Sequence, residues 1–310
     1  MSLSNHSLKE AINQKASELG FVKTGFSNTE VLLNESEKLE NWLDKGYDAD
    51  MKWIEKGFEK RKDIFKILPE AKTIISFAYN YYTNDRPEYD KNPKISRYAW
   101  GKDYHIIIKE KLKILCEFIK ASSQSSDIKT LYYVDDGPVM DKVWAVKSGI
   151  GWMGKHTNVI NSEYGSWIFL SEIITNLEFD HYDSPVEDLC GSCSLCVDAC
   201  PTGAIEEDYV VNSNKCISYQ TIENKGEIPP NIDLSGWIYG CDICQDVCPF
   251  NSQPVLTTEK DFDMIEFLKV RSLMNLNSLD ENSFKEVFMD SPIKRTKHSG
   301  WKRNLERFKN

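Results

Sequence analysis

The sequence lacks the features of membrane proteins and of common nucleotide-binding folds. No stretch approaches the roughly 20 apolar residues that a transmembrane helix needs. Neither a GxGxxG turn after a first strand nor a P-loop GxxxxGK[ST] occurs, so a Rossmann nicotinamide site is unsupported. A signal peptide is also missing, because apolar residues between positions 8 and 19 are helix-spaced and interleaved with Lys and Glu. We therefore expect a soluble, cytoplasmic protein without a membrane partner.

Positive charge is scarce except near the C-terminus. The net charge of −10 argues against a surface that binds nucleic acid over its whole area. Residues 294–310, by contrast, hold seven Lys or Arg against the single Glu306. This segment is either a local patch that binds phosphates or a solvated, frayed C-terminus. The sequence leaves both alternatives open.

Cysteine is plentiful, and its spacing is the most informative feature of the chain. Eight of the nine cysteines lie within residues 190–248. The run CxxCxxCxxxCP at 190–201 is the bacterial ferredoxin pattern, in which three cysteines bind one [4Fe-4S] cluster and the fourth reaches the other. A second run lacks its first cysteine, since Ile238 occupies that position, and Cys216 is the only nearby thiol left to replace it. The predicted ligand sets are Cys190, Cys193, Cys196 and Cys248 for one cluster, and Cys200, Cys216, Cys241 and Cys244 for the other.

Zinc is the competing interpretation, because CxxC pairs also suit tetrahedral zinc sites. Zinc ribbons, however, do not need a further cysteine followed by proline at the end of each run, and both runs here end in CP. Disulfides are disfavoured in a reducing compartment. The ninth cysteine, Cys116, lies in an apolar run and is expected to be a core thiol.

The spacing of apolar residues predicts a mixed fold. Residues 8–70 are helix-spaced and predict two or three helices. Further along, the pattern predicts strands at 73–82, 130–134, 157–161 and 166–175, helices at 104–120 and 139–148, and short helices around 261–270 and 283–288. The predicted fold class is therefore α+β or α/β with at least one central sheet.

We divide the chain into an α/β domain at residues 1–180, a ferredoxin-like module for two [4Fe-4S] clusters at 181–255, and a short helical, basic segment at 256–310. An electron carrier needs only the clusters, whereas here a whole domain precedes them. That domain contains polar and aromatic segments that electron storage does not require, namely SRYAWGKDYH (96–105), VDDGPVM (134–140) and GIGWMGKH (149–156). The sequence thus favours a reductase.

Six motifs spread over nearly the whole chain carry a family resemblance. They are VDDGPVMDK (134–142), GIGWMGKH (149–156), CGSCSLCVDACPTGAI (190–205), CISY (216–219), YGCDICQDVCPFN (239–251) and SPIKR (291–295). Together they resemble the epoxyqueuosine reductase family. The resemblance implies an oxidoreductase with two [4Fe-4S] clusters and cobalamin that acts on tRNA in the last step of queuosine synthesis. It would remove the epoxide oxygen of epoxyqueuosine as water, with two electrons relayed through the clusters to cobalamin.

By the same resemblance Asp135 is the proton donor to the epoxide oxygen. A carboxylic acid can do this near neutral pH only if burial raises its pKa from about 3.9. The alternative for Asp135 is a turn aspartate in the Asp-Asp-Gly-Pro sequence, and Asp136 is the fallback donor.

The implied cobalamin contacts are Tyr98, Asp135, Trp152, Lys155, His156, Ser171, Cys241 and Asp242. The DxHxxG cobalamin signature begins at Asp103, but Ile108 stands where its glycine would be. Cobalamin is therefore expected to bind without a histidine ligand from that motif.

The implied macromolecular substrate is a tRNA with a GUN anticodon that carries epoxyqueuosine. Lys294, Arg295 and Arg303 are the expected phosphate contacts, and the surroundings of Lys215 and Tyr219 are the alternative. Longer members continue past Arg303 into HEAT-like repeats, whose contacts would be absent from this chain. We also expect a monomer that accepts electrons from an external low-potential donor such as flavodoxin or ferredoxin.

Two other functions remain in play at this point. A cobalamin and iron-sulfur reductive dehalogenase has the same cofactors, but it usually carries a twin-arginine signal, which is not found near this N-terminus. An iron-sulfur electron-transfer subunit would need no corrin.

Overall fold

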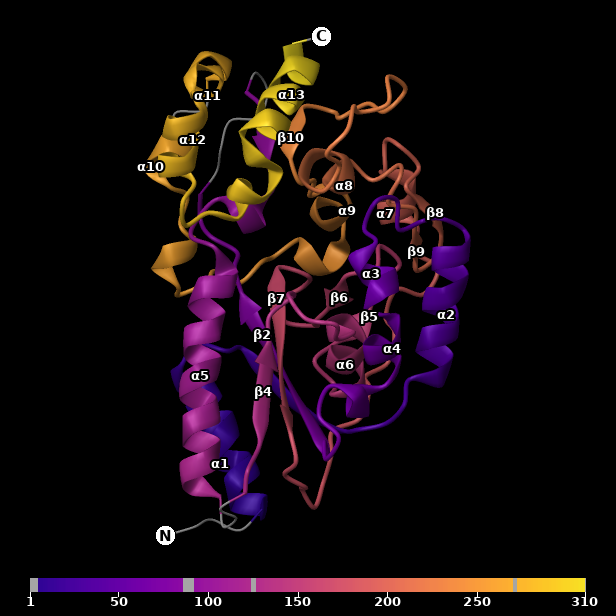
Figure 1. The fold of residues 1–310 in the computed structure, drawn as a ribbon, viewed down its shortest axis with the longest axis vertical. Helices are drawn as coiled ribbons and strands as arrows, with labels where there is room; N and C mark the ends of the chain where they lie inside the picture. Colours follow the sequence, from indigo (N-terminus) through magenta and orange to yellow (C-terminus); the bar gives the residue numbers. More distant parts are fainter. Residues whose placement is uncertain (1–4, 86–91, 124–126, 270–271, 310) are drawn as a thin grey trace.

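The computed structural model describes residues 5–85, 92–123, 127–269 and 272–309. A central sheet has two long helices on one side, and the cluster module and the C-terminal helices lie beyond one end of the sheet (Figure 1). The sheet has the strand order β1-β2-β7-β4, with β1 at Lys23–Asn28, β2 at Thr73–Asn80, β7 at Ile168–Thr175 and β4 at Thr130–Tyr133. All of its pairings are antiparallel.

This arrangement confirms the mixed fold and the strands expected near residues 73, 130 and 166. β2 is buried along its whole length, as expected for a central strand rich in β-branched and aromatic residues. The strand expected at 157–161 is reduced to β6 (Val159–Ile160), which pairs with β5 (Trp152–Met153) outside the central sheet.

The two faces of the sheet are covered by different helices. On one face α1 (Asn5–Glu18) and α5 (Tyr104–Ser122) pack their apolar residues against Phe77 and Ile173. On the other face α6 (Asp141–Lys147) packs Trp144 against Ile74 and Ile174. Burying each of these large side chains contributes roughly 1.5–3 kcal/mol, so all three helices are held by the sheet more than by their own propensity.

The prediction of helices alone for residues 8–70 is wrong, because β1 lies within this segment. β1 is an edge strand that exists through its pairing with β2, and its short KTGFSN sequence has too few apolar residues to reveal a period of two. Three short helices follow it, α2 (Leu33–Asp44), α3 (Trp53–Lys56) and α4 (Phe58–Lys62).

The cluster module consists of short elements between long turns. These are α7 (Leu195–Asp198), β8 (Ile205–Glu207), β9 (Val210–Val211), α8 (Ile217–Ile222), β10 (Trp237–Tyr239) and α9 (Ile243–Asp246). β8 pairs with β9, and β10 runs parallel to β3 (Lys94–Ile95), which joins the module to the first domain.

The C-terminal segment is folded. It contains α10 (Glu266–Lys269), α11 (Leu273–Ser278), α12 (Glu281–Val287) and α13 (Lys297–Lys309). Trp301 and Leu305 of α13 are fully buried, so the alternative of a frayed, solvated tail is wrong. Within the described part of the chain, no helix is both long and apolar enough to cross a membrane.

Candidate active site and cluster module

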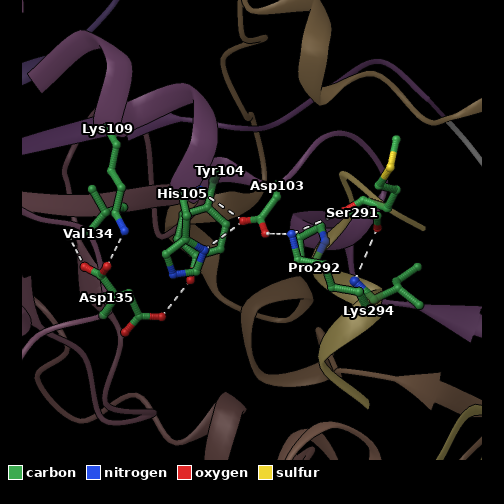
Figure 2. A network of polar contacts seen from close by, with 12 residues as sticks. Asp103, Tyr104, His105, Lys109, Val134, Asp135, Ser291, Pro292 and Lys294 are labelled. Atoms are coloured by element: carbon green, nitrogen blue, oxygen red, sulfur yellow. Dashed lines mark hydrogen bonds and ion pairs between the residues drawn. The ribbon is translucent and has the colours of Figure 1, made fainter. Parts of the chain in front are cut away.

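Asp135 lies at the exit of β4, in a loop that bends away from the sheet. The strand ends at Tyr133, Val134 is buried, and Asp135 has a φ of 53°, in the left-handed region that Asp tolerates better than most residues. The carboxylate of Asp135 is exposed, and its Oδ2 accepts a hydrogen bond of 2.6 Å from the Tyr104 hydroxyl (Figure 2).

Asp136 takes the turn-forming role that was the alternative for Asp135. Its Oδ1 accepts a 3.0 Å hydrogen bond from the backbone N–H of Val134, and its Oδ2 binds Lys109. The Asp135 side chain is therefore not needed to shape the turn, which leaves it available for chemistry.

Aromatic side chains surround Tyr104. Its ring stacks on Phe169 with centroids 4.1 Å apart and an interplanar angle of 7°, and Tyr98 lies edge-on to it at 6.3 Å. Burial raises the pKa of Tyr104 well above its ordinary value, and the nearby Asp135 charge raises it further. Tyr104 therefore stays protonated and acts as a hydrogen-bond donor.

Two buried carboxyls lie behind Asp135. Asp141 begins α6, and Glu172 is a fully buried residue of β7. Burial raises the pKa of Asp141 to about 6 and that of Glu172 well above its usual range, and the charge of Asp135 raises both further. The charged form of both carboxyls is thus disfavoured.

Lys142 and His156 lie near these carboxyls. Lys142 keeps accessible surface, yet burial among the surrounding protein lowers its pKa. We call the partly open surroundings of Lys142, His156 and Asp135 the recess. Burial and the Lys142 charge lower the pKa of His156 to about 4, so the ring is neutral. Because its Nδ1 accepts from the backbone of Asn158 at 3.2 Å, the proton sits on Nε2, which is buried without a partner among the described residues.

Ser171 does not belong to this recess. Side chains alternate along β7, so Ser171 shares the α1 and α5 face with Phe169 and Ile173, whereas Glu172 points to the α6 face. The structure therefore places Ser171 on the opposite face of β7 from Glu172, on the face against which Tyr98 and Tyr104 also pack.

Trp152 and Lys155 lie beside Cys190. Trp152 packs in one cluster with Cys190, and both Trp152 and the backbone of Lys155 partly offset the burial that raises the pKa of Cys190. The Lys155 ammonium pairs with Asp208 at 2.9 Å. Asp242 is equally occupied, because its buried carboxyl accepts hydrogen bonds from Ser96 and from the backbone N–H of Arg97. These residues support the cluster module rather than an open pocket.

The eight thiols fall into two neighbouring groups. Burial raises the pKa of Cys196 and of Cys248, and the charges of Cys190 and Cys193 act on both. Burial likewise raises the pKa of Cys216, Cys241 and Cys244. Cys200 is a charged neighbour of Cys216 and Cys241, whereas the charged neighbours of Cys244 are Cys241, Cys216, Asp242 and also Cys196. We call these the outer group (Cys190, Cys193, Cys196 and Cys248) and the inner group (Cys200, Cys216, Cys241 and Cys244).

The thiols do not converge on a point. All nine cysteines are unbridged. Among the residues that the structure describes, no three His, Cys, Asp or Glu side chains are arranged to hold a single metal ion. Cys116 is buried in the core, as expected.

The basic residues near the C-terminus have different surroundings. Lys294 pairs with Asp103 at 3.0 Å. Arg295 pairs with Glu223, lies 5.6 Å from the Trp53 ring centre, and is near enough for the Asp135 charge to raise its pKa slightly, after the larger effect of Glu223. Arg303 instead donates hydrogen bonds to the backbone carbonyls of Gln220, Asn224 and Gly226. In the alternative region, Lys215 pairs with Glu206, and Tyr219 bonds with Asp50.

Sequence reasoning missed Tyr104, Asp141 and Glu172. Tyr104 lies in the segment SRYAWGKDYH and Asp141 in VDDGPVMDK, but the sequence indicates no role for either residue. Glu172 gave a clearer signal, because a lone glutamate inside an otherwise apolar strand is an expensive residue to bury.

Comparisons with known proteins cover the whole chain. The family model of epoxyqueuosine reductase QueG matches residues 61–136, and that of the 4Fe-4S double cluster binding domain matches residues 189–251. An epoxyqueuosine reductase of Cellulophaga algicola is 42% identical over 299 residues, which are 96% of each chain.

Solved structures agree with the sequence relatives. An epoxyqueuosine reductase in complex with an epoxyqueuosine-modified tRNA-Tyr stem loop matches with a TM-score of 0.90 at 32% identity, over 98% of this chain and 81% of that one. A Bacillus subtilis epoxyqueuosine reductase matches with a TM-score of 0.89 at 31% identity, over 98% and 82% of the two chains. In that structure the catalytic loop, which contains an aspartate, is swung out of the active site.

Proposed function

The chain belongs to the epoxyqueuosine reductase family, and we propose that it reduces epoxyqueuosine to queuosine in tRNA. The reaction takes up two electrons and two protons and releases the epoxide oxygen as water. The observation that carries the proposal is the placement of Asp135. Its exposed carboxylate, which accepts a hydrogen bond from Tyr104, stands at a strand exit near the Lys142, Arg61 and Arg295 charges and beside an aromatic cluster.

The two thiol groups are the proposed cluster ligands. The outer group would hold one [4Fe-4S] cluster and the inner group the other, with Cys216 in place of the cysteine missing at Ile238. The inner group lies toward Asp135, because Lys142 is a charged neighbour of Cys216, Cys244 and Asp135 alike. Electrons would therefore enter at the outer cluster and leave from the inner one.

Lys142, His156 and Tyr98 would hold cobalamin beside Asp135, because the Asp135 charge acts on Lys142 and Tyr98, and the Lys142 charge acts on His156. The unpartnered Nε2–H of His156 and the Lys142 ammonium are donors, and a corrin presents amide groups that accept such hydrogen bonds. When bound, cobalamin supplies a strongly reducing cobalt centre at this position. Trp152, Lys155, Cys241 and Asp242 would support the clusters beside it, and Ser171 has no place in the arrangement we propose.

Asp135 would deliver a proton to the departing oxygen. The carboxylate is exposed in this structure, so the burial that a general acid needs would come from the bound cofactor and nucleoside. Glu172 and Asp141 lie near it, and burial disfavours the charged form of both carboxyls.

The tRNA would approach from the side of Arg295. This arginine is close to both Asp135 and the exposed ring of Trp53, so it can meet a phosphate next to the modified nucleoside. Lys294 would assist once its pair with Asp103 opens. Arg303 would act indirectly, by holding the segment between α8 and β10 in place. An external low-potential donor and a cytoplasmic location complete the proposal.

Replacing Asp135 tests the assignment. Asp135→Asn should keep both clusters and bound cobalamin, while turnover of an epoxyqueuosine stem loop falls by a factor of about 10² or more. Asp136→Asn is the matched control, because it removes a neighbouring carboxylate that shapes the turn. If Asp135→Asn kept activity within a few-fold of wild type and Asp136→Asn did not, the proton donor would be Asp136.

A further inference from the structure

The loop that carries Asp135 is attached to α5 at two points. Tyr104, the first residue of the helix, donates to Asp135 Oδ2 at 2.6 Å. Lys109, just over one turn later, binds Asp136 (Figure 2). On its other side the loop is tight, since a Cβ at Gly137 would lie 2.1 Å from the Tyr133 ring, and Arg61 reaches the Gly137 carbonyl at 3.4 Å.

The two attachments differ in strength. Lys109 and Asp136 are each more than a third exposed, and an ion pair of this kind contributes little. Tyr104 is 7% exposed, and its hydroxyl bonds a charged acceptor. A hydrogen bond to a carboxylate is stronger than one between neutral groups, because the acceptor carries a charge.

Tyr104 itself cannot easily move. Its ring lies flat against Phe169, and it starts a helix whose first turn is fixed by Asp103. Asp103 accepts hydrogen bonds from the backbone and ring of His105, and its second oxygen binds Lys294 (Figure 2). The hydroxyl of Tyr104 is therefore a fixed point to which the Asp135 loop attaches.

The hydrogen bond also distinguishes the two oxygens of Asp135. Because Oδ2 accepts the phenol proton, an acid proton on Asp135 resides on Oδ1, which makes no hydrogen bond among the described contacts of Asp135. A carboxyl held by one oxygen presents the other in a constant direction, which is what a general acid requires.

We infer that Tyr104 is a positioning residue that holds the catalytic loop in place and directs Oδ1 of Asp135 toward the substrate. The inference rests on the proposed role of Asp135. A relative whose catalytic loop is swung out of the active site shows that loops of this family adopt a second position. In this chain the Tyr104 hydrogen bond would favour the inward one.

The test compares Tyr104→Phe with Tyr79→Phe in the reconstituted holoenzyme. Tyr79 belongs to the same aromatic core, is 3% exposed, and also donates to a carboxylate, that of Glu259 at 3.1 Å. Both variants lose one buried hydroxyl, so they control for stability. We expect only Tyr104→Phe to raise backbone hydrogen exchange at residues 134–137, by about tenfold, and to lower the single-turnover rate on an epoxyqueuosine stem loop by about tenfold.

A double variant shows whether Tyr104 acts through Asp135. Tyr104→Phe/Asp135→Asn should be no slower than Asp135→Asn alone, since the positioned group is already gone. Additive losses, unchanged exchange in Tyr104→Phe, or equal exchange in both tyrosine variants would overturn the inference. Full activity of Asp135→Asn would instead refute the proposed function of that residue, and the exchange measurement would still report whether the loop is held.

Discussion

Two lysines, one beside each thiol group, lie in opposite environments. Lys142 retains accessible surface, yet the surrounding protein lowers its pKa, and its charged neighbours are Asp135, Asp141 and inner-group thiols. Lys155 is almost covered, yet it is near the surface, and its hydrogen bond with the exposed Asp208 raises its pKa. The protein around Lys142 thus lowers its pKa, whereas the carboxylate beside Lys155 raises its pKa.

The comparison distinguishes the two ends of the cluster module. The outer end is open, with Leu189 and Leu195 about half exposed beside Cys190 and Cys196. The inner end faces the recess that contains Lys142, His156 and the Asp135 loop. A donor protein could therefore approach the outer end, while the substrate occupies the inner one.

Removing a ligand from each end gives the largest expected effect. Cys216→Ala should reduce reconstituted iron from about eight to about four per chain and abolish turnover, because the inner cluster is lost. Cys193→Ala should lose the outer cluster instead, and Cys116→Ala should change neither quantity. Iron and acid-labile sulfide analysis provides the measurement. Loss of both clusters, or of neither, in Cys216→Ala would contradict the ligand sets proposed for the two groups.

Replacing each lysine with glutamine tests whether its charge affects the pKa of His156. Its folded pKa of about 4 lies below the ordinary 6.5, so on acidification the unfolded chain takes up a proton first. The corresponding stability is present above pH 6.5 and is lost as the pH falls toward 4. Lys142→Gln removes a charge that helps lower this pKa, so the variant should lose less stability than wild type over that window.

The expected difference is a few degrees in Tm between pH 7.5 and pH 4.5, measured as the change within each protein. Burial is the larger cause of the His156 shift, so Lys142→Gln should reduce the acid sensitivity without removing it. Lys155→Gln is the control, because Lys155 does not contribute to that shift. Equal acid sensitivity in both variants would mean that Lys142 and Lys155 have the same effect on the pKa of His156.

The sequence predicts the central strands, α5 and the clustering of thiols because those signals are local. Residues 73–80 are β-branched and aromatic, and the CxxC spacing needs no tertiary knowledge. β1 escapes prediction because an edge strand depends on its partner. Ser171 and Glu172 show the same limit. The alternation of side chains along a strand predicts that the two residues face opposite sides of the sheet. Only the packing of α5 and α6 determines which side holds the recess.

The residues of the candidate site likewise divide into those that a local sequence signal predicts and those that only the fold brings together. Asp135 was predicted from its motif, and the structure adds that Asp136 carries the turn. Trp152 lies within the GIGWMG turn and Lys155 follows it directly, yet both lie near Cys190, which is over thirty residues away along the chain. Such pairings arise from the fold and leave no trace in composition or spacing.

The smallest expected effect concerns two arginines that look equivalent in sequence. Arg295 has a 56% exposed side chain at the recess side, whereas Arg303 uses its guanidinium on three backbone carbonyls. If tRNA meets the inner end, Arg295→Ala should lower affinity for a queuosine-type tRNA and reduce the log-log salt slope by about 0.7 to 0.9. Arg303→Ala should lower Tm and leave the slope unchanged, because its charge is not free to meet a phosphate. Titrations of both variants over a range of salt concentrations would decide. An unchanged slope in Arg295→Ala with a reduced slope in Arg303→Ala would place the tRNA away from the recess and reverse the roles of the two arginines.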